Sequence, residues 1–365
     1  MTVSSLLGLG LMSGTSLDGV DAALVRTDGH AARECGHALT EPYPDHLRSA
    51  LRGILGRDAP SDEIAGVERD LTLFHAQAVR SLLDQAGVAA RAVDVIGFHG
   101  HTILHRPHDR RTWQIGDGAL LARETGIPVV NDFRGDDVRA GGQGAPLVPV
   151  FHAALVKGAQ IAGPVAVLNL GGVGNVTWIG ADGDLLAFDT GPGNALIDDW
   201  ALRHTGRPVD LDGALAGQGR AALDRVARFV EHSYFSRRPP KSLDRDDFAR
   251  FAADLVVGLS VHDGAATLSA FTVAAVKRAE THFPAPPHRW LVCGGGRHNP
   301  YVMAGLRQAL SAPVTAVETQ GWDGDALEAQ AFAFLAVRSL HGLPLTFPGT
   351  TGSAKPLTGG RLHRL

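Results

Sequence analysis

Three short turns rich in glycine could hold the phosphates of a nucleotide. The first is Gly14-Thr15-Ser16-Leu17-Asp18-Gly19, the second is Gly171-Gly172-Val173-Gly174-Asn175, and the third is Gly294-Gly295-Gly296. Phosphate oxygens need closely spaced backbone N–H groups, and glycine lets the main chain approach them. A single such turn is more often an ordinary tight turn. Three such turns in one chain favour a nucleotide-binding protein, although the first turn matches neither the P-loop nor the dinucleotide-binding motif.

Two aspartates lie where a carboxylate could do chemistry. Asp18 belongs to the first turn and could hold the water shell of Mg²⁺, which binds proteins through few carboxylates. Asp189 ends an apolar run and precedes Thr190-Gly191-Pro192-Gly193-Asn194, where it could face a cleft and act as a base. It could equally form an Asx-turn or cap the helical stretch that begins at Asn194. The spacing alone leaves both interpretations open.

Residues 99–108 contain four histidines, which invite a metal interpretation. No carboxylate or cysteine with ligand spacing accompanies them, and histidine also hydrogen-bonds sugar hydroxyls and phosphates, so we favour sugar or phosphate binding. Two further polar segments, residues 131–134 and 141–146, indicate a binding loop near a domain junction, with an ordinary linker as the alternative. Residues 114–117 indicate another binding loop or a solvated turn.

The elements that position these residues alternate between strands and helices. Strand-like apolar runs flank the first turn at residues 5–12 and 20–27, and the second at 164–170 and 176–179, with further strands at 94–98, 185–189 and 290–292. Helical spacing covers residues 63–86, 220–231, 248–261, 265–280 and 325–340, the last with Asp325 as N-cap. This pattern predicts an α/β architecture with two similar halves. Residues 234–247, with two prolines and alternating charges, are expected to form a mobile surface loop.

Composition narrows the class of protein. A length of 365 residues favours two domains, and 44% hydrophobic residues are enough for two cores. A net charge of −4 gives no reason to expect nucleic acid or an anionic membrane as a partner. Two distant cysteines, Cys35 and Cys293, argue against a disulfide framework. Neither a signal peptide nor an apolar run that could span a bilayer is visible, so we expect a cytoplasmic protein.

An ordered set of motifs resembles the anhydro-N-acetylmuramic acid kinase family. The resemblance covers essentially the whole chain, and the ordered set is far more specific than any one motif. Its parts are Met12-Ser13-Gly14-Thr15-Ser16-Leu17-Asp18-Gly19-Val20-Asp21, His99-Gly100, Thr102, His105-Arg106-Pro107, Gln114-Ile115-Gly116-Asp117, Asp132-Phe133-Arg134, Gly141-Gly142-Gln143-Gly144-Ala145-Pro146-Leu147-Val148-Pro149, Asn169-Leu170-Gly171-Gly172, Asn175, Phe188-Asp189-Thr190-Gly191-Pro192, Pro240-Lys241-Ser242 and Cys293-Gly294-Gly295-Gly296-Arg297-His298-Asn299.

The resemblance implies an α/β fold of the actin-like ATPase (ribonuclease H-like) type, with two duplicated domains around a nucleotide cleft. We expect the first domain at residues 1–140, with residues 340–365 returning to it, and the second at 141–340. The implied reaction uses ATP and Mg²⁺ to open 1,6-anhydro-N-acetylmuramic acid and phosphorylate O6. The product is N-acetylmuramic acid 6-phosphate for cell-wall recycling. The resemblance also implies a homodimer.

Site residues follow from the same resemblance. Asp189 matches the catalytic aspartate, and Asp18 is the expected metal-binding residue. His101 departs from the glutamine expected in many relatives, which affects sugar contacts rather than the phosphate machinery. The expected sugar-binding residues are His99, Thr102, Asp132, Gln143 and Glu328. The expected ATP-binding residues are Gly14, Thr15, Ser16, Leu17, Asp18, Gly19, Val20, Asp21, Gly171, Gly172, Asn175, Gly294, Gly295 and Gly296.

Other functions stay open at this point. One is a kinase for another small molecule on the same fold, and a second is an actin-like nucleotide-dependent switch or polymer. A third is a metallohydrolase that uses the histidine cluster. Residues 99–107 and 141–149 favour the sugar kinase, because a switch protein would not need them.

Overall fold

The computed structural model describes residues 4–14, 17–243 and 248–365. It forms two compact units, the first from Met1–Gln160 with Ala326–Leu365 and the second from Ile161–Asp325. Residues 141–160 and most of the segment from 326 to 340 therefore pack with the first unit, whereas the sequence-based division placed them in the second domain. How the two compact units correspond to functional domains stays a prediction.

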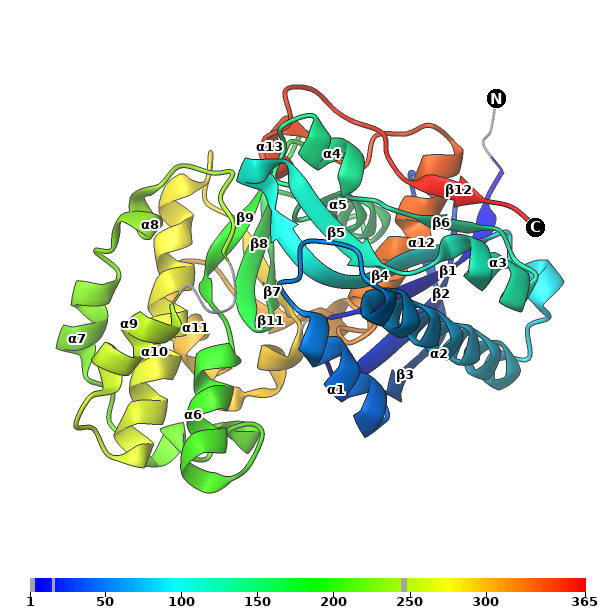
Figure 1. Cartoon of the computed structure of the whole chain (residues 1–365). Helices are drawn as coiled ribbons and strands as arrows, with labels where there is room; N and C mark the ends of the chain where they lie inside the picture. Colours follow the sequence, from blue (N-terminus) through cyan, green and yellow to red (C-terminus); the bar gives the residue numbers. More distant parts are fainter. Residues whose placement is uncertain (1–3, 15–16, 244–247) are drawn as a thin grey trace. The chain divides into compact units, whose positions relative to one another are not determined.

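A seven-stranded mixed sheet forms the centre of the first unit (Figure 1). Its first three strands make an antiparallel meander, and two more strands join in parallel on the other side of the first. In sheet order the strands are β12 (Arg361–His363), β6 (Val129–Asn131), β4 (Val95–Arg106), β1 (Leu6–Ser13), β2 (Gly19–Thr27) and β3 (Ala32–Pro42), and β5 (Arg111–Ile115) pairs with β4.

The five-stranded sheet of the second unit repeats this plan. A meander is again extended by two parallel strands beside its first strand. The order is β11 (Val314–Ala316), β10 (Arg289–Cys293), β7 (Val165–Leu170), β8 (Val173–Ile179) and β9 (Leu185–Pro192). Because this order matches β6, β4, β1, β2 and β3, the two halves are duplicated. The predicted α/β fold of the actin-like type is therefore confirmed.

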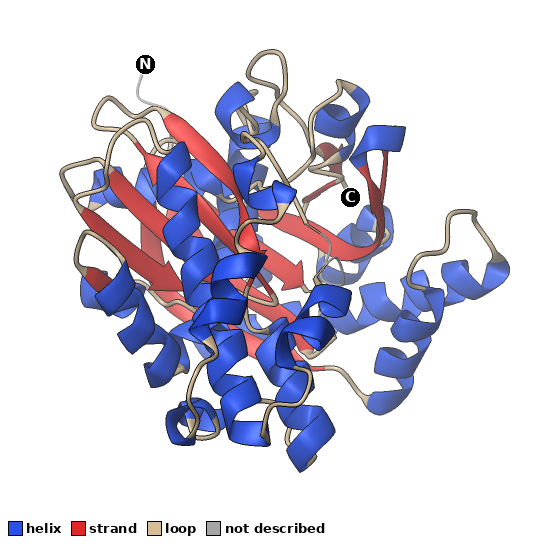
Figure 2. Ribbon diagram, turned by 90° about the vertical axis from the view of Figure 1, so that its left-hand side faces the viewer, coloured by secondary structure: helices blue, strands red, loops and turns tan. Residues whose placement is uncertain are grey.

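Helices flank the strands, as Figure 2 shows by colour. Those described in the first unit are α1 (Asp45–Ile54), α2 (Asp62–Ala86), α3 (Gly118–Thr125), α4 (Gly135–Arg139), α5 (Pro149–Gly158), α12 (Leu327–Leu340) and α13 (Pro348–Thr351). Those described in the second are α6 (Ala195–Thr205), α7 (Leu223–Phe229), α8 (Ser233–Ser236), α9 (Ala249–Val256), α10 (Val261–Ala279) and α11 (Pro300–Ala309).

Glycines in the first sheet let α12 lie directly against it. The leucines that alternate with glycine in β1 belong to the core formed with α1 and α2, so the glycines face the opposite side of the sheet. A Cβ at Gly10 would lie 1.7 Å from the carbonyl oxygen of Ala329, and one at Gly97 would lie 2.0 Å from that of Phe332. Because only a hydrogen fits at these positions, α12 is fixed across β1 and β4. This places Glu328, in its first turn, at a defined point.

The expected N-cap of this helix is wrong. α12 begins at Leu327 with Ala326 at the N-cap position. Asp325 instead accepts two hydrogen bonds from the guanidinium of Arg297, each 2.8 Å long. A charged partner from another element therefore outweighs the local capping preference.

The expected surface loop at residues 234–247 is only partly right for its described part, because residues 236–238 are exposed whereas three side chains near them are buried. Tyr234, Phe235 and Lys241 are only 4%, 1% and 5% exposed. The two aromatic rings belong to the hydrophobic core of the second unit. Residues 244–247 lie outside the described residues. Prolines and charges suggested solvent exposure, but the aromatic anchors decide where this segment lies.

Two further observations concern the class of protein. Among the helices that the structure describes, none has the length and apolar character needed to cross a membrane. Cys293, at the end of β10, is buried and is not part of a disulfide bond.

Candidate active site

The first glycine turn joins β1 to β2. Thr15 and Ser16 lie outside the described residues. The N–H of Leu17 donates to the carbonyl of Gly14 (3.2 Å), and the φ of Leu17 is +58°. Asp18 is exposed, and its Oδ1 accepts the N–H of Gly19 (3.0 Å). The turn thus presents a carboxylate to solvent, as the metal prediction requires.

The two remaining residues of this motif lie in β2. The side chain of Val20 is fully buried, so only its backbone could contact a nucleotide. Asp21 accepts a hydrogen bond from the hydroxyl of Thr40 (2.5 Å) on β3. These two residues stabilise the strand that follows the turn.

A buried histidine connects this turn to the histidine segment. The hydroxyl of Ser13, the last residue of β1, contacts Nδ1 of His101 (2.8 Å) and the hydroxyl of Tyr43 (2.6 Å). Burial lowers the pKa of His101 to about 4, so the ring is neutral at pH 7. His101 therefore holds the end of β1 in place as an uncharged group.

The second and third glycine turns lie at the same edge of the second sheet. β7 and β10 are parallel neighbours, with Cys293 opposite Asn169, and each glycine turn follows the end of its strand. A Cβ at Gly294 would lie 2.2 Å from Oδ1 of Asn169, and the φ of Gly294 is +74°. Only glycine satisfies both conditions without strain. The fold therefore brings together two segments that are more than a hundred residues apart.

Side chains from neighbouring elements fix these two turns. Asn194 donates its N–H to the carbonyl of Gly171 (2.8 Å) and its side-chain amide to that of Leu170 (2.9 Å). Arg297 is 3% exposed at its side chain and donates to the carbonyl of Gly294 (3.0 Å) and to Glu318 (2.7 Å). The carboxylates of Asp325 and Glu318 raise the pKa of Arg297 against the opposing effect of burial.

Asp189 lies in β9, opposite Asn175 of β8. Oδ2 of Asp189 accepts the N–H of Leu243 (2.8 Å), and its backbone carbonyl accepts the hydroxyl of Tyr234 (2.6 Å). Burial raises the pKa of Asp189 to about 7, an effect that the Leu243 N–H and the charge of Lys241 oppose. The residue at the N-cap of α6 is Asn194, so the alternative in which Asp189 caps this helix is wrong.

A carboxyl group with this pKa is suited to proton transfer. At neutral pH it is partly ionised, and it can accept a proton from a substrate or a water molecule without a large energetic penalty. Perturbed pKa values of this kind concentrate at active sites.

His99 and Arg134 form the centre of a polar cluster in the first unit. Nε2 of His99 accepts hydrogen bonds from Arg134 (3.2 and 3.1 Å), so the neutral ring carries its proton on Nδ1 and donates to the carbonyl of Gly100 (2.8 Å). Burial, followed by the charge of Arg134, lowers the pKa of His99 well below its ordinary value. Both ring nitrogens are engaged, so this arrangement leaves neither of them for a metal.

Arg134 also reaches two other predicted sugar-binding segments. Its guanidinium donates to the carbonyl of Gly144 (2.7 Å), next to Gln143. Burial lowers the pKa of Arg134 to about 10, and the carboxylate of Glu328 opposes this shift. Arg134 belongs to the motif Asp132-Phe133-Arg134 but is not among the predicted binding residues. The signal that could have found it is an arginine flanked by predicted binding residues on both sides.

Residues 141–146 are built as a turn around a buried carboxylate. Asp137 is 2% exposed, and its Oδ2 accepts the N–H of Gly144 (2.7 Å). Its Oδ1 accepts the hydroxyls of Thr346 (2.6 Å) and Thr351 (2.7 Å). A segment with these contacts is a structured loop of the first unit, so the linker alternative is not supported.

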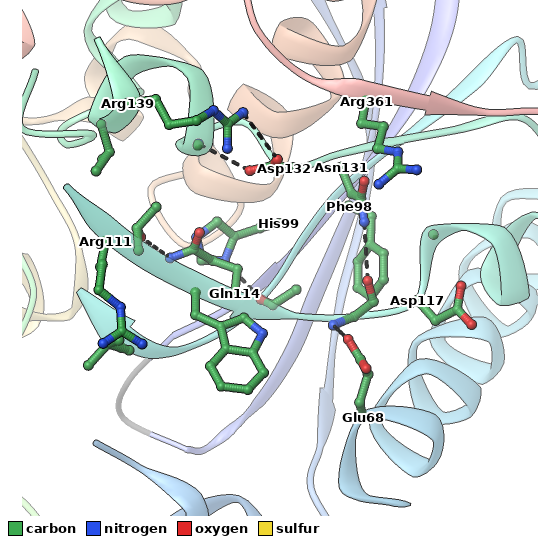
Figure 3. A pocket seen from close by; sticks show the side chains of 18 of the residues that line it. Glu68, Phe98, His99, Arg111, Gln114, Asp117, Asn131, Asp132, Arg139 and Arg361 are labelled. Carbon is green, nitrogen blue, oxygen red and sulfur yellow. Dashed lines mark hydrogen bonds and ion pairs between the residues drawn. The ribbon is translucent and has the colours of Figure 1, made fainter. Parts of the chain in front are cut away.

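A pocket of about 690 Å³ opens in the first unit beside β4 and β5 (Figure 3). Of the five predicted sugar-binding residues, His99 and Asp132 line it, whereas Thr102, Gln143 and Glu328 do not. Asp132 faces Arg139, with 3.8 Å between Oδ2 and Nη2, and Gln114, which lines the pocket, donates a hydrogen bond to Thr102 (3.2 Å). The volume lies in the usual range for small-ligand sites, and the lining is rich in charged side chains.

The histidine cluster and Asp18 are the two candidate metal-binding positions. Within residues 4–14, 17–243 and 248–365, no group of three or more histidine, cysteine, aspartate or glutamate side chains could hold a metal ion. A single carboxylate such as Asp18 is still compatible with Mg²⁺, which commonly relies on one or two carboxylates together with water and phosphate oxygens.

Comparisons with known proteins give concordant results. A family model described as anhydro-N-acetylmuramic acid kinase matches residues 6–364. The anhydro-N-acetylmuramic acid kinase of Paramagnetospirillum magneticum is 64% identical over 358 residues, which cover 98% of this chain and 99% of that protein. That of Rhodospirillum rubrum is 58% identical over 355 residues, covering 96% and 92%.

Solved structures resemble the chain more distantly. A ROK family glucokinase from Streptomyces griseus, in complex with glucose and AMPPNP, covers 90% of this chain and 99% of its own, with 16% identity and a TM-score of 0.43. The (R)-2-hydroxyglutaryl-CoA dehydratase component A from Acidaminococcus fermentans covers 92% and 100%, with 12% identity and a TM-score of 0.48. At this level neither carries an argument about function.

Proposed function

The chain belongs to the anhydro-N-acetylmuramic acid kinase family, and we propose that Asp189 is the general base with which it opens its substrate. It has the ATP-dependent kinase activity of that family. The observation that carries the proposal is the environment of Asp189: a carboxyl group at the edge of a glycine-rich region, with a pKa raised to about 7 by burial. That value suits proton abstraction at neutral pH.

The substrate dictates the order of events. In a 1,6-anhydro sugar O6 is already bonded to C1, so there is no hydroxyl proton at O6 for a base to remove. Asp189 instead takes a proton from a water molecule as the water oxygen bonds to C1. The C1–O6 bond breaks, and O6 takes its electron pair and attacks the γ-phosphorus of ATP. The products are N-acetylmuramic acid 6-phosphate and ADP, and the proton held by Asp189 returns to solvent.

Nucleotide binding is assigned to the three glycine turns. The residues fit a phosphate ligand, because Gly172 and Gly295 are exposed and a Cβ at Gly295 would have no atom within 4 Å. Backbone N–H groups can therefore be approached without interference from side chains. Asp18 would hold the water shell of Mg²⁺, which when bound neutralises charge on the phosphates.

Sugar binding is assigned to His99, Thr102, Asp132, Gln143 and Glu328. Arg134 holds several of these residues in position. Arg134 contacts His99 and the backbone beside Gln143, and the charge of Glu328 acts on it. A guanidinium group held in this way can recognise the carboxylate of the lactyl group, for which arginine has a suitable geometry. The family match favours this function over a nucleotide switch, another small-molecule kinase or a metallohydrolase.

Two further assignments complete the proposal. We infer a cytoplasmic location, because the enzyme uses ATP and belongs to a family of cell-wall recycling kinases. We also infer a homodimer, as the resemblance to the family implies. Analytical ultracentrifugation tests the second inference, and a monomer at all concentrations would contradict it.

Isotope labelling tests the order of bond changes. The reaction is run in ¹⁸O-water with ATP, Mg²⁺ and the anhydro sugar, and the product is examined by mass spectrometry. We expect one labelled oxygen at C1 and none in the phosphate. Unlabelled product incubated in ¹⁸O-water for the same time controls for spontaneous exchange at C1. Label in the phosphate would mean that water attacks phosphorus, and the proposal would fail.

A further inference from the structure

A buried lysine lies next to the proposed base. The chain contains only four lysines, Lys157, Lys241, Lys277 and Lys355, among 34 basic residues. Three of them are exposed, whereas Lys241 is 5% exposed. Burying a lysine costs free energy unless its charge is used or compensated. In a chain that otherwise relies on arginine, the lysine at this position needs an explanation.

Lys241 is held by several contacts in the second unit. Its Nζ donates to the carbonyl of Tyr234 (3.1 Å), contacts Nε2 of His282 (3.3 Å), and lies 4.5 Å from the centre of the Tyr234 ring and 5.5 Å from that of Phe188. Cation–π contacts of this kind stabilise a desolvated ammonium group. The side chain is therefore fixed in one position.

The backbone next to Lys241 runs alongside Asp189. The N–H of Asp189 donates to the carbonyl of Lys241 (3.0 Å), and the N–H of Leu243 donates to Oδ2 of Asp189 (2.8 Å). Tyr234, whose carbonyl accepts from Nζ, donates its hydroxyl to the carbonyl of Asp189 (2.6 Å). The ammonium group thus ties residue 241 to Tyr234, and the backbone of residues 241 and 243 together with the Tyr234 hydroxyl holds Asp189.

We infer that Lys241 is a positioning residue for the reaction: its buried ammonium group supports the ionised form of the Asp189 carboxyl group and anchors residues 241–243 against it. This inference rests on the proposed function, in which Asp189 must be ionised to accept a proton. A hydrophobic residue at position 241 could fill the same volume, but it would supply no charge.

The charges around the pair are consistent with this role. Burial, together with Arg237 and Arg278, lowers the pKa of Lys241 to about 8, and Asp189 opposes this shift. Lys241 is therefore mostly protonated at pH 7 and below, where Asp189 takes up its proton. Burial also lowers the pKa of the adjacent His282, with the charges of Lys241 and Arg278 contributing, so His282 adds no positive charge there at neutral pH.

The pH dependence of kcat/KM tests this inference. In Lys241→Met the positive charge is absent, so the carboxyl group of Asp189 holds its proton to higher pH. We expect the acid limb to move upward by about one pH unit, since a nearby opposite charge typically shifts a carboxyl pKa by one unit or more. On the acid side of the limb, activity would then be about tenfold below wild type, and the two proteins would converge at high pH.

Two further variants distinguish the effect of the Lys241 charge from the effect of its packing. Lys241→Arg keeps the charge, so its acid limb should stay near that of wild type even if its kcat is lower. Lys277→Met removes an exposed lysine that pairs with Glu280, and it should leave the profile unchanged. Thermal unfolding of each variant identifies any general loss of structure.

The outcomes distinguish this inference from the proposed function. If Lys241→Met lowers kcat at all pH values while the acid limb stays in place, Lys241 is only structural and the inference fails. If Asp189→Asn retains near-normal turnover, the proposed function itself fails, whatever the lysine variants do.

Discussion

Asp189, which is half-buried, and the buried His99 with its half-buried partner Arg134 are two polar sites that differ in how fully their hydrogen-bonding groups are paired. Both nitrogens of His99 have partners, and its low pKa keeps the ring neutral. The carboxyl group of Asp189 has a strong partner in the N–H of Leu243, yet burial still raises its pKa to about 7. A proposed sugar-binding ring that does not change its protonation can keep both of its nitrogens hydrogen-bonded. A group that must accept a proton has to be left partly uncompensated, at a cost in stability.

The largest expected effect is on turnover. Asp189→Asn keeps the shape of the side chain but removes the base, so turnover should fall by a factor of about 10² to 10⁴. Binding of ATP and sugar should stay nearly normal by calorimetry. Asp182→Asn, in the exposed turn between β8 and β9, is the matched control and should be fully active. Equal activity in both variants would contradict the role of Asp189.

The next effect is on stability in the first unit. Arg134→Met leaves His99 and the carbonyl of Gly144 without their donor, so the free energy of unfolding should fall by about 2 to 4 kcal/mol. Arg139→Met removes an exposed ion pair with Asp136 and should change it by less than about 1 kcal/mol. Urea denaturation measures both. If the two variants lose the same free energy of unfolding, the hydrogen bonds of Arg134 stabilise the first unit no more than an exposed ion pair does.

The cost of an uncompensated carboxyl group can be measured in the same way. The folded-state pKa of Asp189, about 7, exceeds the ordinary aspartate value of 3.8, so the folded protein binds this proton more tightly than the unfolded chain. This group therefore lowers stability as pH rises from about 4 to about 7. Asp189→Asn should be more stable than wild type by about 1 to 3 kcal/mol at pH near 8. The difference should shrink toward pH near 4, and a difference independent of pH would refute this account.

An exposed carboxylate should show a smaller effect. Asp18→Asn should keep the fold and raise the Mg²⁺ concentration needed for half-maximal activity by roughly tenfold. Asp45→Asn, an exposed aspartate paired with Arg48 at the start of α1, serves as the control. Unchanged turnover at limiting Mg²⁺ would remove Asp18 from the metal role.

The smallest expected effect is the absence of titration at His99. Because its pKa lies well below the ordinary value, the ring resonances of His99 should stay constant between about pH 6 and pH 8 in NMR spectra. The signal can be assigned with His99→Gln. A resonance that moves through this range would show that the ring is less enclosed than its contacts with Arg134 indicate.

The sequence by itself determined the fold class and the candidate segments. Strand–turn–strand patterns and helical spacing are local, and glycine in a turn has a local conformational reason. The duplicated α/β organisation, the three glycine turns and the resemblance to the kinase family could therefore all be recognised from residue order. Even the candidate base, Asp189, was visible as a carboxylate between an apolar run and a glycine-rich segment, although its strand, β9, continues past it to Pro192.

Only the tertiary structure decided how these residues behave chemically. The pKa of Asp189 depends on burial and on Leu243 and Lys241, which lie more than fifty residues further along the chain. The sequence predicted that Lys241 lies in a mobile loop, but its side chain is buried. It also predicted that Asp325 caps a helix, but the Asp325 carboxylate accepts a hydrogen bond from Arg297 instead. Burial and long-range partners arise from packing between distant segments, and no local pattern encodes them. For this reason the sequence could name candidate reactive residues, whereas their protonation and rigidity required the folded protein.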